Sequence, residues 1–184
     1  MRQMEQALFA AGFACLALFL WTAGERAWFQ RLYLHQLEDN SSARYSAATL
    51  RSGPLGRIEV PRVGLSAAIL DGVDTGTLDR AVGHVPGTAY PGEASGRVAL
   101  AAHRDSFFRN LGDLKKGDTI RLEVGRRIRE YQVESTQVVK PGQTEVLAPT
   151  HDSVLTLITC YPFRYLGSAP ERFIVNARLV KDAE

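Results

Sequence analysis

The hydrophobic and polar positions divide this chain into three parts. The stretch from Ala7 to Gly24 contains 18 residues without a charge, which is enough for a helix to cross the hydrocarbon core of a membrane. Residues 38–56 are polar, rich in Ser and Ala, and end in a Gly-Pro-Leu-Gly sequence, as is typical of a linker. From Arg57 onward, short apolar runs alternate with polar turn residues. The pattern predicts a membrane anchor with a helical extension over 1–37, a linker over 38–56 and one folded domain over 57–184.

The apolar runs of the folded domain have the length and the β-branched composition of strands. A short helix is expected over 75–81, with Thr75 as its cap, and a helical turn over 106–111. Residues 83–96 and 140–153 contain Pro-Gly pairs and are expected to form turns and loops. The expected strands are 57–60, 65–70, 97–103, 119–124, 128–139, 154–160 and 172–180. Seven or eight short strands with few helices predict an all-β fold, a closed or nearly closed barrel.

The N-terminal apolar stretch fits an uncleaved anchor better than two alternatives. A cleaved signal peptide would have a basic segment before a shorter apolar run, whereas here Arg2 is offset by Glu5. A buried amphipathic helix would be apolar on one face, whereas this stretch is apolar on every face. Arg26 and Arg31 follow the stretch, so basic residues alone slightly favour a cytoplasmic position for the domain.

Composition narrows the possible functions. At 184 residues, with 45% hydrophobic and 23% charged residues, the chain can form one well-buried domain plus appendages. A net charge of +2 gives no indication of nucleic-acid binding. Asp71, Asp74 and Asp79 do not have the spacing of an EF-hand loop, so no metal and no cofactor are predicted. Cys15 and Cys160 lie in different parts of the chain, so an intrachain disulfide is not expected.

Three chemically capable side chains lie at the ends of expected strands. Cys160 ends the strand over 154–160, His103 ends another, and Arg172 begins a third. Each has a structural alternative, because the thiol can be an inert hydrophobe, the imidazole a satisfied strand-end group and the guanidinium a partner of a surface carboxylate. Together, however, they supply the nucleophile, the acid/base and the oxyanion stabiliser of acyl transfer. Their combination favours a catalytic site.

At these residues the sequence resembles the sortases, cysteine transpeptidases that attach proteins to the cell envelope. Residues 156–160, Thr-Leu-Ile-Thr-Cys, match the TLxTC signature of that family, with an Ala-His pair before it and an Arg about a dozen residues after it. Longer pieces, over 81–88, 103–109, 160–163 and 167–173, resemble the class D branch. The resemblance extends from about Arg57 to Val180, which is nearly the whole expected domain.

The resemblance implies a role for each of the three residues. Cys160 would be the nucleophile, His103 the acid/base and Arg172 the group that stabilises the substrate carbonyl and the oxyanion. It also implies substrate proteins that carry an LPXTG-like sorting signal, cut between Thr and Gly through a thioacyl enzyme. An amine acceptor of the peptidoglycan, the envelope or a pilin would then take the acyl group. His151, on the loop before Cys160, is the alternative base.

Other residues are weaker candidates. Asp105 can orient His103 or, as its position favours, cap the turn that follows. His84 also matches the class D pattern, although its place in a turn segment favours a structural role. The candidate substrate-binding residues are Thr159, His84, Tyr161, Val146 and Leu147.

The resemblance also implies a single-pass protein of the cell membrane whose catalytic domain is extracytoplasmic, and we follow it over the small charge bias. The lipid contact would come from the stretch between Ala7 and Gly24. Residues 38–56 lack an Asp-Pro-aromatic lid motif, which favours an enzyme without a lid and counts against pilus assembly. Two other functions remain open at this point. One is a thiol hydrolase or a transpeptidase acting on peptidoglycan stem peptides, and the other is a non-catalytic envelope binding module.

Overall fold

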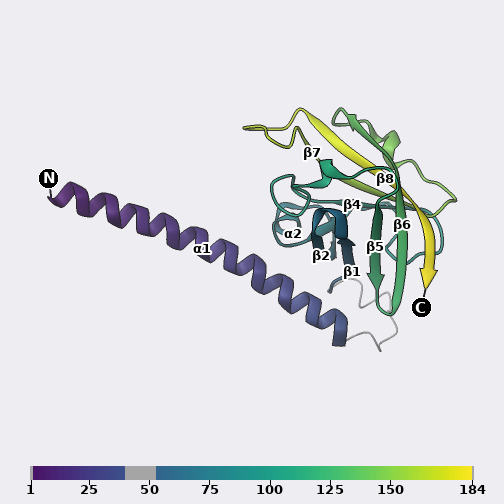
Figure 1. The fold of residues 1–184 in the computed structure, drawn as a ribbon, viewed down its shortest axis with the longest axis horizontal. Coiled ribbons are helices and arrows are strands. Elements are labelled where there is room, and N and C mark those ends of the chain that lie inside the picture. Colours follow the sequence, from purple (N-terminus) through teal and green to yellow (C-terminus); the bar gives the residue numbers. More distant parts are fainter. Residues whose placement is uncertain (1, 40–52, 184) are drawn as a thin grey trace.

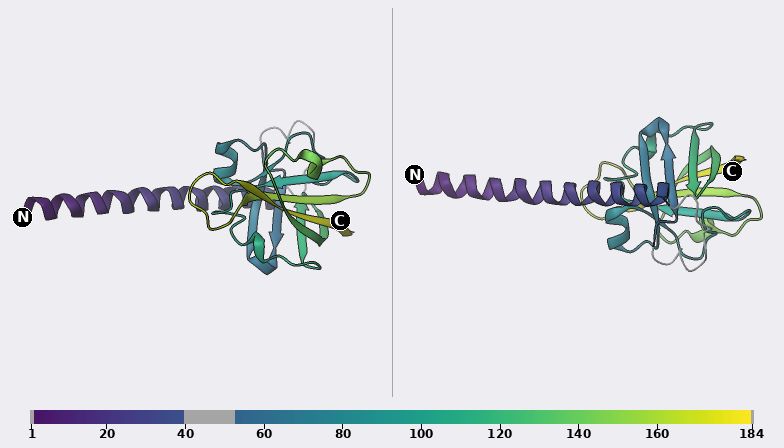
Figure 2. Two further views of the ribbon diagram at one scale, coloured as in Figure 1. Left: turned by 90° about the horizontal axis from the view of Figure 1, so that it is seen from above. Right: turned by 90° about the horizontal axis from the view of Figure 1, so that it is seen from below.

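In the computed structural model, which describes residues 2–39 and 53–183, a long helix leads to a β-barrel (Figure 1). Helix α1 (Arg2–Asp39) is continuous, and most of it extends away from the barrel (Figure 2). Its window Met4–Trp21 has a mean hydropathy of 1.6 and none of it is buried. By length and composition, α1 could cross a membrane. Most of the expected linker, and with it the stretch in which a lid motif was sought, lies outside the described residues.

The barrel is closed and contains eight strands in the order β1-β2-β3-β4-β7-β8-β6-β5. The expected all-β barrel with short helices is therefore confirmed. The pairs β2–β3 and β4–β7 are parallel and the other pairs are antiparallel. The strands are β1 (Gly56–Val60), β2 (Leu65–Asp71), β3 (Val82–His84), β4 (Arg97–Ala101), β5 (Thr119–Val124), β6 (Arg127–Val139), β7 (Val154–Tyr161) and β8 (Glu171–Ala183). The short helices are α2 (Thr75–Arg80), η3 (Pro61–Val63), η4 (Leu111–Asp113) and η5 (Thr144–Leu147).

Three local expectations need correction. The segment after residue 82 was expected to be turns, but Val82–His84 forms the short strand β3 because it pairs with both β2 and β4. The cap of α2 is Asp74 rather than Thr75, since its carboxylate accepts from the backbone N of Thr77 at 3.1 Å. Hydrogen bonds from the Thr77 side chain and backbone lower the pKa of Asp74. Leu55, expected in the linker, is buried and belongs to the barrel, because its N donates to the O of Ile69 at 2.7 Å.

Strand β7 lies between β4 and β8 in the part of the barrel wall that carries the candidate site. Its residues Val154, Leu155, Thr156 and Leu157 are all buried, although alternate side chains point to opposite faces of a strand. Leu155 and Leu157 pack in the core. On the outer face the Thr156 hydroxyl accepts from Arg97 at 2.8 Å and donates to Asn176 at 3.0 Å. Buried Arg129 helps to hold the neighbouring loop, since it donates to the carbonyl oxygens of Glu93 and Ala94 and pairs with Asp182 at 3.2 Å.

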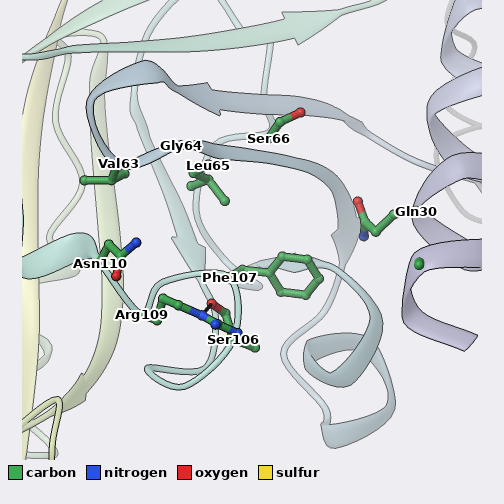
Figure 3. A pocket seen from close by; sticks show the side chains of 10 residues that line it. Gln30, Val63, Gly64, Leu65, Ser66, Ser106, Phe107, Arg109 and Asn110 are labelled. Atoms are coloured by element: carbon green, nitrogen blue, oxygen red, sulfur yellow. Dashed lines mark hydrogen bonds between the residues drawn. The ribbon is translucent and has the colours of Figure 1, made fainter. Parts of the chain in front are cut away.

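Helix α1 contacts the barrel through the side chain of Gln30. Strand β3 is so short that it pairs only with the end of β2 and leaves the backbone N of Ala68 without a strand partner on that side. Gln30 fills this position, since its Oε1 accepts from Ala68 N at 3.0 Å and its Nε2 donates to Arg80 O at 2.5 Å. Beside this contact lies a pocket of about 400 Å³ between α1, the β1–β2 hairpin and the loop after β4 (Figure 3). The helix is therefore attached to the barrel wall at Gln30.

Replacing Leu157 by Ala tests the central position of β7. Leu157 has no exposed surface, so its truncation leaves a cavity and should lower the free energy of unfolding by about 2–5 kcal/mol. Leu166→Ala is the matched control, because Leu166 is 99% exposed and its truncation should change stability by less than about 0.5 kcal/mol. Urea unfolding in detergent measures both, and equal losses would contradict the assignment of β7 to the core.

Candidate active site

The antiparallel ladder between β7 and β8 brings Cys160 and Arg172 together. The two residues are direct partners in this ladder, and both are half-buried. Directly opposed residues have Cα atoms about 4.5–5.5 Å apart and side chains on the same face of the sheet. The two side chains therefore project from the same, outer face of the sheet, close to the end of the ladder.

The parallel ladder between β4 and β7 brings His103 to the other side of Cys160. Ala101 is the partner of Ile158, and the N of Ala102 still donates to the O of Ile158 at 3.3 Å. The ladder ends at this pair, and continuing its register by two residues along each segment places His103 beside Cys160. Neighbouring strands are about 4.8 Å apart, so the imidazole-bearing residue is adjacent to the thiol-bearing one. On this continued register His103 and Arg172 flank Cys160.

The imidazole of His103 has a carboxylate neighbour that the sequence did not indicate. Its Nε2 is 3.6 Å from Oδ1 of Asp79 on α2, and the two side chains are 38% and 49% exposed. Sequence reasoning considered Asp105 for this position and Asp79 only as a possible metal ligand. The contact joins residues 24 positions apart, so no local pattern could reveal it. A carboxylate at this place can orient the ring.

The guanidinium of Arg172 is held by its own loop. Its Nη1 donates to the O of Ala169 at 3.2 Å and to the O of Glu171 at 2.9 Å. Within the described part of the chain it forms no ion pair with a carboxylate, so the structural alternative considered for it does not apply. Arginine carries five N–H donors in a planar fork, and those on Nε and Nη2 can serve a substrate oxygen.

Arg104, which directly follows His103, ties the two loops of the site together. It donates to three carbonyl oxygens of the β7–β8 loop, those of Pro162, Tyr165 and Gly167, each at 2.9 Å. Its guanidinium also lies 5.8 Å from the centre of the Tyr165 ring. Sequence reasoning missed this residue, and its only signal was its position next to the candidate acid/base. Arg104 couples the loop that carries His103 to the loop between Cys160 and Arg172.

Two candidate substrate-binding residues are buried and have structural contacts instead. Thr159 is 2% exposed, and its hydroxyl donates to the O of Ala102 at 2.8 Å, which fixes the strand end before His103. His84 is 1% exposed, with Nδ1 at 3.0 Å from Oδ1 of Asp71 and its ring stacked on Tyr90. Neither side chain reaches the surface, so neither can contact a bound peptide in this conformation.

The remaining candidates are three half-buried substrate-binding residues and the alternative base, His151. Tyr161 is half-buried and packs against Phe173 and Phe163 beneath the β7–β8 loop. Val146 and Leu147 are half-buried on η5. His151 lies before the start of β7, and the seven residues from Val154 to Cys160 span about 20 Å of strand. His151 is therefore at the far end of β7 and is not positioned to act on Cys160.

A strip of small and apolar side chains extends from Cys160 along the outer face of the sheet. The registers place Ala101 of β4 and Ile158 of β7 on this face, and both are half-buried, whereas Ile174 of β8 beside them is buried. The loop over 140–153 lies against the same face, since Nε of Arg97 donates to the O of Ala148 at 2.9 Å. Burial lowers the pKa of Arg97, which nevertheless stays charged at neutral pH.

The aspartates considered for a metal have separate roles. Asp71 contacts His84, Asp74 caps α2 and Asp79 faces His103. Among the residues that the structure describes, no group of three His, Cys, Asp or Glu side chains could hold a metal ion. The arrangement around Cys160 instead offers a thiol, an imidazole and a guanidinium on one face, which are groups suited to acyl transfer.

Comparison with known proteins identifies the family. The family model described as Sortase domain matches residues 58–180. Sortase D of Bacillus subtilis (strain 168) is 36% identical over 126 residues, which cover 68% of this chain. The chain belongs to the sortase family. The aligned segment spans 63% of the B. subtilis protein, less than two thirds of its length.

Other sortases are also similar to this chain in sequence and in fold. Sortase A of Bacillus anthracis is 31% identical over 130 residues, which cover 68% of this chain and 60% of that protein. The structure of a Clostridium perfringens Sortase D5 transpeptidase matches with a TM-score of 0.71 and 25% identity, over 83% of this chain and 99% of that one. Sortase A of Listeria monocytogenes matches with a TM-score of 0.64 and 27% identity, over 70% and 88% of the two chains. Sortases are cysteine transpeptidases, and the similarity to Sortase D confirms the expected class D resemblance.

Removing the carboxylate beside His103 should lower the rate of acyl transfer modestly. An exposed ion pair contributes up to about 1 kcal/mol, so Asp79→Asn should reduce kcat by up to about fivefold. Asp105→Asn is the matched control and should leave kcat unchanged. Steady-state transfer of a labelled peptide to an amine measures both variants. A loss in Asp105→Asn alone would show that the wrong carboxylate was assigned to His103.

Proposed function

We propose that this chain is a membrane-anchored cysteine transpeptidase that cleaves an LPXTG-like sorting signal between Thr and Gly. It then transfers the acyl group to an amine acceptor of the cell envelope. The observation that carries the proposal is the position of Cys160 opposite Arg172 in the β7–β8 ladder, with His103 two residues past the last pair of the β4–β7 ladder. A lone thiol is often inert, but a thiol between these two groups has the environment of a nucleophile.

The first half of the reaction forms a thioester. The thiolate of Cys160 attacks the carbonyl carbon of the Thr-Gly bond, and the carbonyl oxygen becomes an oxyanion. The guanidinium of Arg172 donates to this oxygen and offsets its charge, because arginine stays protonated throughout. His103 in its protonated form gives its proton to the leaving Gly nitrogen, so the C–N bond breaks and the thioacyl enzyme remains.

The second half reverses the proton transfer. The neutral imidazole of His103 takes a proton from the incoming amine, whose nitrogen attacks the thioester carbon. The C–S bond then breaks and releases the thiolate of Cys160 together with the new amide. Water in place of the amine would give slow hydrolysis. Asp79, 3.6 Å from Nε2 of His103, suits a ring that alternates between charged and neutral forms.

Two further features support the choice of substrate and location. The small and apolar strip that includes Ala101 and Ile158 suits an extended peptide with apolar side chains, as an LPXTG-like signal is. The apolar window of α1 suits a single-pass anchor, and sortases are generally membrane-associated. We place the barrel outside the cytoplasm, where sorting signals and envelope amines meet.

Replacing Arg172 by Lys tests the proposed oxyanion role. The fork of donors becomes a point charge, so kcat for peptide transfer should fall by roughly 10²-fold or more, with little change in stability. Arg164→Lys, on the same loop, is the matched control and should keep the wild-type rate. Chromatographic analysis of the products with and without an amine acceptor measures transfer and hydrolysis separately.

The same assay separates the alternatives. His103→Ala should abolish transfer and His151→Ala should not, and the reverse result would assign the base to His151. Formation of the hydrolysis product alone, with every amine offered, would indicate a thiol hydrolase. Acylation by peptidoglycan stem peptides but not by LPXTG-like peptides would give the chain a different substrate. Wild-type function in Cys160→Ala would leave only a binding module.

A further inference from the structure

The loop between β7 and β8, residues 162–170, presents an apolar tip to solvent. Leu166 is 99% exposed, more than any other large hydrophobic residue that the structure describes, and its neighbour Tyr165 is 48% exposed. Arg164 is the only charged residue in the loop, which contains no Asp or Glu. Single exposed apolar residues are common, but an adjacent aromatic, aliphatic and basic triplet is the combination found at membrane interfaces.

The loop holds this tip in place. Nη2 of Arg104 binds the carbonyl oxygens of Tyr165 and Gly167, the two residues on either side of Leu166. At the base of the loop, the Phe163 ring packs edge-on against Phe173 with centroids 5.3 Å apart. Because the backbone is fixed on both sides, Leu166 is kept pointing outward rather than folding back onto the barrel.

The tip points along α1 toward its N-terminus. In Figure 1 the β7–β8 loop, at the yellow end of the colour scale, is the part of the barrel that reaches furthest in that direction. Both views of Figure 2 agree, with this loop at the end of the barrel nearest the apolar part of α1. The loop and the apolar window thus approach the same plane.

The attachment of α1 keeps the barrel close to that plane. Gln30, which binds Ala68 and Arg80, lies nine residues after Trp21, the last residue of the apolar window. At about 1.5 Å per residue this separation is about 13 Å along the helix. The headgroup layer on each side of a bilayer is about 5–8 Å thick, so a barrel attached at Gln30 lies next to it.

We propose that the β7–β8 loop dips its tip, Tyr165 and Leu166, into the lipid surface that α1 crosses. Leu166 enters the boundary of the acyl chains, the Tyr165 ring lies at headgroup level and Arg164 pairs with anionic phosphate. The proposal rests on the proposed membrane anchoring of α1. Since Cys160 and Arg172 flank the loop, this contact holds the active-site end of the barrel at the membrane.

A probe at Leu166 tests the contact in the full-length chain. Leu166→Cys in a Cys15→Ala, Cys160→Ala background is labelled with the fluorophore NBD and reconstituted into phosphatidylcholine–phosphatidylglycerol vesicles. Val180→Cys, an apolar position 59% exposed near the C-terminal end of β8, is the matched control. We expect a blue-shifted emission at Leu166, protection from aqueous iodide, and quenching by nitroxide-labelled lipid several-fold stronger than at Val180.

The controls separate this proposal from the anchoring on which it rests. If the chain fails to float with the vesicles, the anchoring itself is wrong and the loop proposal falls with it. If the chain floats but iodide quenches both probes equally and nitroxide lipid quenches neither, the anchoring stands and the loop proposal is overturned. The probe at Leu166 could also stay protected from iodide in detergent, with protection that grows with protein concentration. That result would show that the tip contacts a second copy of the chain, and it would also overturn the loop proposal.

Discussion

Strand β7 is held between β4 and β8 by two ladders of opposite sense, and the site depends on the register of both. A shift of one residue in either ladder would turn Cys160 to the opposite face from Arg172 or from His103. The register is fixed by burial, since Leu155 and Leu157 must point into the core. It is also fixed at the strand end, where the hydroxyl of Thr159 binds the carbonyl of Ala102. Core packing therefore decides which three side chains meet on the outer face.

Contacts between residues distant in sequence then fix the loops and orient the side chains around the site. Arg104 joins the loop that follows β4 to the loop that follows β7, across 58 to 63 positions of sequence. Asp79 reaches His103 from α2. The same β7–β8 loop that Arg104 fixes also carries the apolar tip, so one guanidinium links the geometry of the site to the proposed contact with the membrane. Gln30 adds a second link, since it ties the helix to β2 at Ala68, on the side where β3 does not reach.

The sequence predicted the barrel well, because most strands are β-branched runs bounded by Gly and Pro. It missed β3, whose three residues include Gly83 and acquire their strand form only through β2 and β4. Cys160, His103 and Arg172 were recognisable by residue type and by the TLxTC match, and the β7–β8 ladder pairs Cys160 with Arg172. Asp79 and Arg104 were not recognisable, since their partners are distant in sequence. Thr159 could have been excluded as a substrate contact, because neighbours on a strand face opposite sides.

The most direct test of the account is the intact mass of the enzyme after incubation with LPXTG-like peptides and no amine. The account predicts an added mass equal to the peptide fragment that ends in Thr, attached to Cys160 and absent in Cys160→Ala. Addition of an amine should remove the fragment and yield the matching amide. Cys15 is an internal control, because it is the only other thiol and lies in the apolar helix. No adduct with any such peptide, or an adduct on Cys15 alone, would contradict the account.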